Sequence, residues 1–135
     1  MTTPPSAVPE PARRRRSKLP LILAAIILVP ALVFGAYTAA VLKVNYSDGD
    51  RAGILQKFSR KGWICKTFEG ELAMSIVPGV SPTIWEFSVR DEALRAPLDS
   101  ALGKRVVLHY TEHRGVPTKC FGTTNYFVDR VRLVQ

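Results

Sequence analysis

Residues 19–42 contain no charged side chain, although charged residues make up 22% of the whole chain. A helix of these 24 residues is about 36 Å long at about 1.5 Å per residue, which is enough to cross a hydrocarbon core of about 30 Å. Pro20 falls in its first turn, and Pro30 falls near its middle, where a proline kinks a membrane helix without preventing it. The absence of charge therefore predicts a transmembrane helix, taken as residues 19–43.

A cleaved export signal is the alternative interpretation, because a basic segment, an apolar segment and small residues follow one another here. The apolar region of such a signal is usually about 7–15 residues long and the whole signal about 15–30 residues. Here the apolar run alone is longer, and it follows a polar leader of 18 residues. We therefore expect the segment to be retained as an anchor.

A cluster of positive charge stands immediately before the apolar run. It consists of Arg13, Arg14, Arg15, Arg16 and Lys18. Positive flanks stay in the cytoplasm during membrane insertion, and only Lys43 directly follows the run. We therefore expect a single-pass protein of the bacterial inner (plasma) membrane, with a cytoplasmic N-terminus and a periplasmic C-terminal domain. A nuclear-type or nucleic-acid patch and an anionic-lipid site are alternative interpretations of the arginine run.

Large apolar side chains are nearly absent from residues 1–12, which hold four prolines. Such a segment cannot offset the entropy of ordering its chain, so we expect residues 1–18 to be a disordered cytoplasmic tail. Residues 44–135 suit one small domain. Half of the net charge of +8 lies beyond residue 42. This mild excess suits anionic headgroups or acidic polymers and predicts no nucleic-acid partner.

Runs of β-branched and aromatic residues, separated by turn residues, predict five strands in the domain. They are residues 51–58, 63–74, 83–89, 105–111 and 121–134. A turn over 59–62, closed by Gly62, predicts a hairpin between the first two strands. The repeat of Leu94, Leu98 and Leu102 predicts a short helix over 91–102.

Five strands with one helix between the third and fourth follow the order of a small OB-like barrel. Gly53, Gly70 and Gly122 stand where strands of such a barrel bend or bulge. We therefore predict one N-terminal transmembrane helix and, over residues 44–135, a mainly-β, OB-like five-stranded barrel. An SH3-like barrel or a twisted antiparallel sheet packed on the helix is the alternative.

Only two cysteines occur, Cys65 and Cys120, and their spacing excludes a Cys-x-x-Cys redox site. Outside the cytoplasm the two thiols would form a disulfide if their Cα atoms lay about 4.4–6.8 Å apart. Alternatively they are two small buried residues that never meet, because the second and fifth strands of an OB fold are not neighbours. Both interpretations stay open.

Two kinds of side chain suggest chemistry without completing a site. His109 and His113 have a spacing similar to that of zinc ligands, but they fall on an expected strand and loop, and no third ligand is evident. Glu69 and Glu71 share a strand face at about 7 Å, within the range of inverting glycoside hydrolases. We expect no metal, no cofactor and no enzymatic activity, with a small envelope hydrolase using Glu69 or Glu71 as the alternative.

Basic residues alternate with aromatic ones, a pattern with which OB domains hold oligonucleotides or sugars. The predicted binding face consists of Lys57, Arg60, Lys61, Trp63 and Lys66. Most of the aromatic rings are nevertheless expected in the core, because a domain of this size needs them there.

Several short motifs together resemble a known group of proteins. They are YSDGDRAG at 46–53, QKFSRKG at 56–62, KTFEGE at 66–71 and GTTNY at 122–126. With them the chain resembles small single-span bacterial membrane proteins without assigned function, often labelled 6-phosphogluconate dehydrogenase. That label conflicts with the residues, because the Gly-x-Gly-x-x-Gly of a dinucleotide-binding fold occurs nowhere in the sequence. The resemblance implies no catalytic or ligand residues.

The predicted function is that of a membrane-tethered periplasmic binding or assembly module of the bacterial envelope. Its expected partners are the lipid bilayer and an envelope protein, glycan or lipid surface, since tethering favours weak contacts by raising the effective concentration. An assembly role would use the helix kinked at Pro30 to pack against a larger membrane complex. The oligomeric state does not follow from the sequence.

Overall fold

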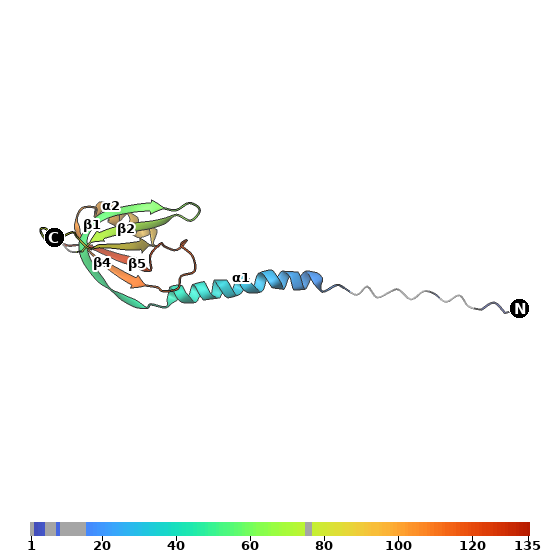
Figure 1. Cartoon of the computed structure of the whole chain (residues 1–135). Coiled ribbons are helices and arrows are strands. Elements are labelled where there is room, and N and C mark those ends of the chain that lie inside the picture. Colours follow the sequence, from blue (N-terminus) through green and yellow to red (C-terminus); the bar gives the residue numbers. More distant parts are fainter. Residues whose placement is uncertain (1, 5–7, 9–15, 75–76) are drawn as a thin grey trace. The chain divides into compact units, whose positions relative to one another are not determined.

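The computed structural model describes residues 2–4, 8, 16–74 and 77–135. They form a long helix and a small β domain (Figure 1). The chain divides into two compact units, residues 1–34 and residues 35–135. Most of the tail predicted over 1–18 lies outside the described residues, and so does the basic flank except for Arg16 and Lys18.

The helix α1 covers Leu19–Lys43, as the uncharged run predicts, and contains Pro30. Its mean hydropathy reaches 2.6, and its length and composition are sufficient to cross a membrane. A signal sequence near an N-terminus has the same properties, so this helix by itself identifies a membrane anchor or a signal sequence.

The β domain contains five strands, with one short helical segment between the third and the fourth. The strands are β1 (Ser47–Lys61), β2 (Thr67–Ala73), β3 (Ile84–Val89), β4 (Arg105–Glu112) and β5 (Tyr126–Leu133). They form a closed ring in the order β1-β2-β3-β5-β4. Four of the pairings are antiparallel, whereas β3 and β5 pair in parallel through Ser88 and Phe127 alone. The OB-like prediction is confirmed, but the ring is not a regular barrel because this last seam is so short.

Strand β1 is 15 residues long and pairs with β4 through its first half and with β2 through its second half. A Cβ atom at Gly53 would clash with the carbonyl oxygen of Ala73, so a glycine is required where the two strands cross closely. The register shifts between Leu55 and Lys57, and such a bulge bends a strand. In Figure 1, β1 curves so far that both of its ends lie on the same side of the domain.

The observed bounds correct the predicted hairpin. Strand β1 continues to Lys61, and the β1–β2 loop is residues 62–66, with Gly62 at φ +135°. The turn predicted at 59–62 was wrong because the pairing of β1 with β2 continues through those polar residues to Lys61 and Thr67. The β4–β5 loop is residues 113–125, so the fifth strand begins five residues later than predicted.

The helical segment is also shorter than predicted, since it consists of η1 (Glu92–Leu94) and α2 (Arg95–Ser100). The side chain of Asp91 accepts a hydrogen bond from the backbone N–H of Ala93 at 2.9 Å and so caps the start. Leu98 is fully buried, whereas Leu102 is 42% exposed because the helix has already ended.

The core is formed by the inward-facing side chains of the ring together with those of α2. Its buried members are Leu55, Leu72, Trp85, Phe87, Val89, Leu98, Ala101, Val106, Leu108 and Val128. Burying one such Leu or Phe side chain stabilises the fold by about 1.5–3 kcal/mol. The guanidinium of Arg51 lies 4.9 Å from the ring centre of Trp85 and 5.3 Å from that of Tyr110, which covers the edge of this core.

Candidate binding surface at the loop end of the OB-like domain

A disulfide joins the β1–β2 loop to the β4–β5 loop. Cys65 and Cys120 are bonded, with their Cα atoms 4.9 Å apart. The alternative that these residues never meet is wrong, because both lie in loops and not in the second and fifth strands, where the sequence pattern placed them. Strands β2 and β5 are indeed not paired. The two loops therefore lie at the same end of the domain, here called the loop end.

The last residues of α1 are held by the same β4–β5 loop. The hydroxyl of Tyr37 donates a hydrogen bond to the carbonyl oxygen of Gly115 at 3.0 Å. The ring of His113 is 5% exposed, and its Nδ1 lies 3.2 Å and 3.0 Å from the carbonyl oxygens of Val41 and Val44. Because carbonyls only accept, Nδ1 carries the proton and caps the end of the helix.

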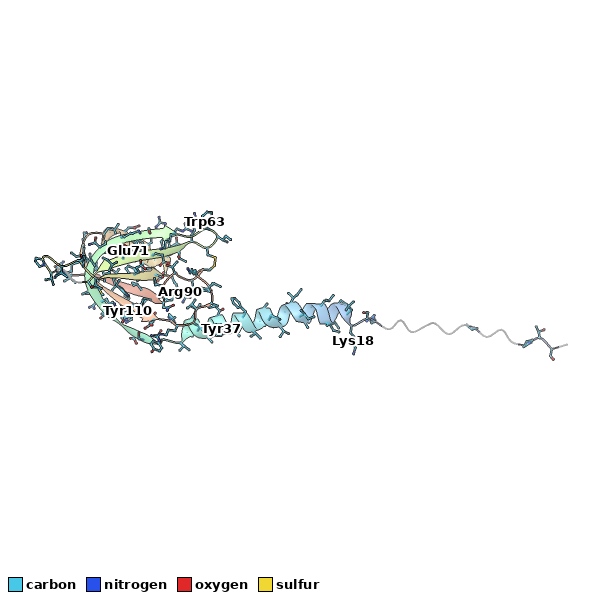
Figure 2. All side chains as sticks on the ribbon, in the orientation of Figure 1. Lys18, Tyr37, Trp63, Glu71, Arg90 and Tyr110 are labelled. Carbon is cyan, nitrogen blue, oxygen red and sulfur yellow. A yellow bond between two sulfur atoms is a disulfide. The ribbon has the colours of Figure 1, made fainter. Side chains whose placement is uncertain are left out.

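An apolar tip, formed by Trp63 and Ile64, projects from the loop end. These two side chains are 100% and 98% exposed. They line a shallow cleft with the disulfide and with Lys61 and Lys119, both of which carry positive charge. In Figure 2, Trp63, Tyr37 and Arg90 lie on the same side of the domain. The predicted binding face did not include Lys119 or Ile64, because the sequence pattern placed Ile64 in a strand over 63–74 and not in the loop 62–66.

The structure divides the predicted binding face into two parts. Lys61 and Trp63 line the cleft of the loop end, and Lys66 lies in the same loop. Lys57 instead forms an ion pair with Glu71, with Nζ and Oε1 3.1 Å apart. Arg60 lies over the ring of Phe68 at 5.8 Å. Within the described residues, Lys57 is thus the member of the predicted face whose charge is neutralised by an ion pair.

A second groove continues the basic surface away from the cleft. Its lining includes Arg60, Lys66, Phe68, Arg90 and Phe121. The guanidinium of Arg90 lies 5.9 Å from the ring centre of Phe121. Cations above aromatic faces leave the guanidinium N–H groups free at the edge of the stack. The loop end and this groove together form one surface with an excess of positive charge.

The two candidate carboxylates have structural partners. Glu69 is 5% exposed and accepts hydrogen bonds from the hydroxyls of Thr67 and Ser88, both at 2.7 Å. It also accepts one from the backbone N–H of Thr123 at 2.9 Å. Glu69 therefore joins β2 and β3 to the β4–β5 loop. Glu71 accepts a hydrogen bond from Lys57 of the neighbouring strand. Glu69 and Glu71 therefore both stabilise contacts between neighbouring strands or loops.

The start of β1 is held by a third carboxylate. Glu112 accepts a hydrogen bond from the hydroxyl of Ser47 at 2.7 Å and one from Nε of Arg114 at 2.9 Å. These bonds hold the pKa of Glu112 below its ordinary value, with the Ser47 bond as the larger cause. The hydrogen bond between Arg114 and Glu112 also raises the pKa of Arg114. The guanidinium of Arg114 lies 3.7 Å from the ring centre of Tyr46.

The two histidines do not converge on a common point. Nδ1 of His109 lies 2.6 Å from a carboxylate oxygen of Asp129, whereas His113 caps α1. Within the described part of the chain, no group of three or more His, Cys, Asp or Glu side chains is placed to hold a metal ion.

These observations define a class of protein. It consists of an apolar helix followed by an OB-like domain whose loop end is basic. A family model described as "Domain of unknown function (DUF8785)" matches residues 45–131. The chain therefore belongs to this family. The matched range begins after α1 and contains most of the strand ring. Among curated proteins, none matches the sequence significantly.

Solved structures with a similar fold include mitochondrial single-stranded DNA binding proteins from S. cerevisiae, Rim1, in two crystal forms. One has 11% sequence identity and a TM-score of 0.51 over 68% of this chain and 97% of that chain. Another has 14% identity and the same TM-score over 67% of this chain and 98% of that chain. At such low identity the likeness establishes the shared OB-like fold.

The prediction that excluded nucleic acid as a partner is wrong, because the similar structures are described as single-stranded DNA binding proteins. It rested on the small net charge of the domain as a whole. In the part of the chain that the structure describes, lysines and arginines without an ion pair gather at the loop end and in the neighbouring groove. Local charge matters more for polyanion binding than the net value.

Proposed function

We propose that this protein is a membrane-tethered, non-enzymatic binding module of the bacterial envelope, with its OB-like domain on the periplasmic side. The observation that carries the proposal is that His113 caps the end of α1 and that Tyr37 of α1 donates a hydrogen bond to Gly115 in the β4–β5 loop. Removal of α1 as a signal would take away the bond from Tyr37 to Gly115 and one of the two carbonyl acceptors of His113, that of Val41, and the loss of such bonds lowers stability. Retention of the helix as an anchor keeps these bonds.

Two further features support a periplasmic domain. Positive charge precedes α1, and such flanks stay in the cytoplasm. The Cys65–Cys120 disulfide persists in oxidising compartments such as the periplasm and is rare in the cytosol. Both features favour export of the chain that follows α1.

The use of Glu69 and Glu71 in structural bonds supports a binding role over hydrolysis. A general acid must reach its substrate, whereas Glu69 is 5% exposed and its carboxylate oxygens already accept three hydrogen bonds from the protein. An envelope protein, glycan or lipid surface is the partner that the loop end would bind.

Single-stranded nucleic acid is a second candidate ligand, favoured by the descriptions of the similar structures and by the arginines above aromatic rings. Its phosphates would follow the basic groove, and binding would weaken with salt. The test is the anisotropy of a labelled oligothymidylate added to the full chain in nanodiscs. A rise that salt reverses supports this ligand, and no rise at low salt excludes it.

The tether and its direction are tested by reporter fusions behind Gln135 in a bacterial host. We expect a phosphatase that is active only in the periplasm to be active, and the mature chain in the membrane fraction to keep its full mass. The control replaces the four arginines at 13–16 with glutamate, which should abolish phosphatase activity because the flank then permits the opposite orientation. A cytoplasmic reporter signal, or a mature chain that begins after Lys43, contradicts the proposal.

A further inference from the structure

Among the described residues of the domain, no other large apolar side chains are as exposed as those of the apolar tip. Its two side chains, Trp63 and Ile64, are almost completely exposed, whereas the other tryptophan, Trp85, is 6% exposed in the core. Exposing two large neighbouring apolar side chains forgoes the stabilisation that their burial would bring. Such a patch, surrounded by polar residues, marks a surface that meets another apolar phase.

The loop that carries the tip is stiffened by covalent and hydrogen bonds. Cys65, directly after Ile64, is tied to Cys120. The β4–β5 loop that contains Cys120 is in turn tied to the strands through the bond from the Thr123 N–H to Glu69. The tip is therefore held in its exposed position before any partner binds, which lowers the entropic cost of binding.

The same loop locates the tip relative to the end of α1. The β4–β5 loop contacts Tyr37, Val41 and Val44 through Gly115 and His113, and its other part is bonded to Cys65. Tyr37 belongs to the uncharged run of the helix. The loop that carries the tip is thus connected, through the β4–β5 loop, to the last residues of the apolar helix.

The charges around the tip fit an anionic lipid surface. Lys61, Lys66 and Lys119 flank it, and none of them forms an ion pair within the part of the chain that the structure describes. Tryptophan concentrates at membrane interfaces because its ring is amphipathic. Base stacking would also use Trp63, but it gives no role to Ile64, which has no aromatic face.

We propose that the apolar tip inserts into the interfacial region of the bilayer that holds α1, with the three lysines binding anionic headgroups. The domain is then fixed to the membrane at two points and presents its remaining surface in one orientation. This inference rests on the proposed function only in that α1 is a membrane anchor.

The test uses the full chain reconstituted in vesicles of phosphatidylcholine, with or without phosphatidylglycerol, in which part of the lipid is brominated. The Trp63→Phe variant reports Trp85 alone, so subtraction isolates the emission of Trp63. We expect this emission to shift to shorter wavelength and to be quenched by brominated lipid, more strongly with phosphatidylglycerol. Because brominated lipid is present in both leaflets, the result does not depend on the orientation of the chain in cells.

Three variants sharpen the test. Ile64→Asn should abolish the quenching of Trp63, and Lys119→Gln should lower the ratio of docked to free tip about five-fold in anionic vesicles. The control is Val80→Asn, which changes a residue that is 62% exposed in the β2–β3 connection, at the opposite end of β2. This control should leave quenching unchanged.

Unshifted, unquenched emission of Trp63 in anionic vesicles would overturn the inference. So would a shift of Trp63 that requires added oligothymidylate and occurs without quenching by lipid, because the tip would then be a base-stacking site. Neither result affects the reporter fusions, so the proposal that α1 is a membrane anchor would stand even if the insertion of the tip were refuted. Conversely, a cytoplasmic domain in cells would contradict the proposed function and leave quenching in vesicles intact.

Discussion

The outer face of β2 and β3 and the loop end belong to the same small domain, but they differ in whether their charged side chains are bonded within the fold. On the first surface, Glu69 accepts three hydrogen bonds and Glu71 forms an ion pair. At the loop end, Trp63 and Ile64 are exposed and the lysines around them have no ion pair in the described chain. Groups that are already bonded hold the fold, whereas groups that the fold leaves free are available to a partner.

Loss of the disulfide should produce the largest effect, because it joins the two loops of the loop end across a long stretch of chain. Cys65→Ser with Cys120→Ser opens a connection between residues 55 positions apart, and we expect a loss of about 4 kcal/mol in the free energy of unfolding. Chemical denaturation under oxidising conditions measures this loss. The unmutated chain with its disulfide reduced should match the variant, and an unchanged denaturation midpoint would contradict a structural role for the bond.

Breaking the carboxylate network should have the next largest effect. Glu69→Gln replaces an acceptor with an NH₂ group that faces hydroxyl or N–H donors, and we expect a loss of about 2 kcal/mol. The matched control is Glu86→Gln on the same strand pair, because Glu86 is exposed and should change stability by less than about 0.5 kcal/mol. Equal effects of the two substitutions would mean that the buried bonds of Glu69 add nothing.

A smaller effect, which depends on pH, should come from Glu112. Its pKa is lower in the folded chain than the ordinary value of 4.5, so its bonds stabilise the fold above that value. This contribution is lost as the pH falls through the folded pKa. Melting temperatures measured below about pH 4.5 should therefore fall less steeply for Glu112→Gln than for the unmutated chain. Identical slopes for the two proteins would show that Glu112 contributes no proton linkage.

The apolar tip should have the smallest effect on folding. Trp63→Ser with Ile64→Ser removes side chains that contact water, so stability should change by less than about 0.5 kcal/mol. The same variant should lose the quenching by brominated lipid described above. Intact folding together with lost docking would show that the loop end serves binding, whereas the face of β2 and β3 stabilises the fold. A large loss of stability would instead assign the tip to the fold.

Much of the architecture could be predicted because it depends on local pattern. The uncharged run specified the bounds of α1, and the strand predicted over residues 83–89 corresponds to β3. The hairpin between β1 and β2 was predicted, but its turn was displaced to 62–66 because the pairing of the two strands outweighed the turn preference of residues 59–62. Local preference is weaker than register when one face of a strand is buried.

The candidate site was less predictable because it depends on contacts between distant residues. The bond of Cys65 to Cys120 and the capping of Val41 and Val44 by His113 cross long sequence separations that no spacing rule encodes. Lys57 and Lys61 look equivalent in the sequence, yet only Lys57 lies opposite Glu71 across the strand pair.

The sequence by itself determined that the chain has one apolar span and, behind it, a β domain of OB type, because hydrophobic runs and strand patterns are local properties of a polypeptide. Only the tertiary structure decided which charges are paired, which thiols meet and which apolar side chains remain outside. The reason is geometric: the curvature of β1 brings its two ends to the same side of the domain, and the β4–β5 loop there is bonded both to Cys65 and to Tyr37 of α1.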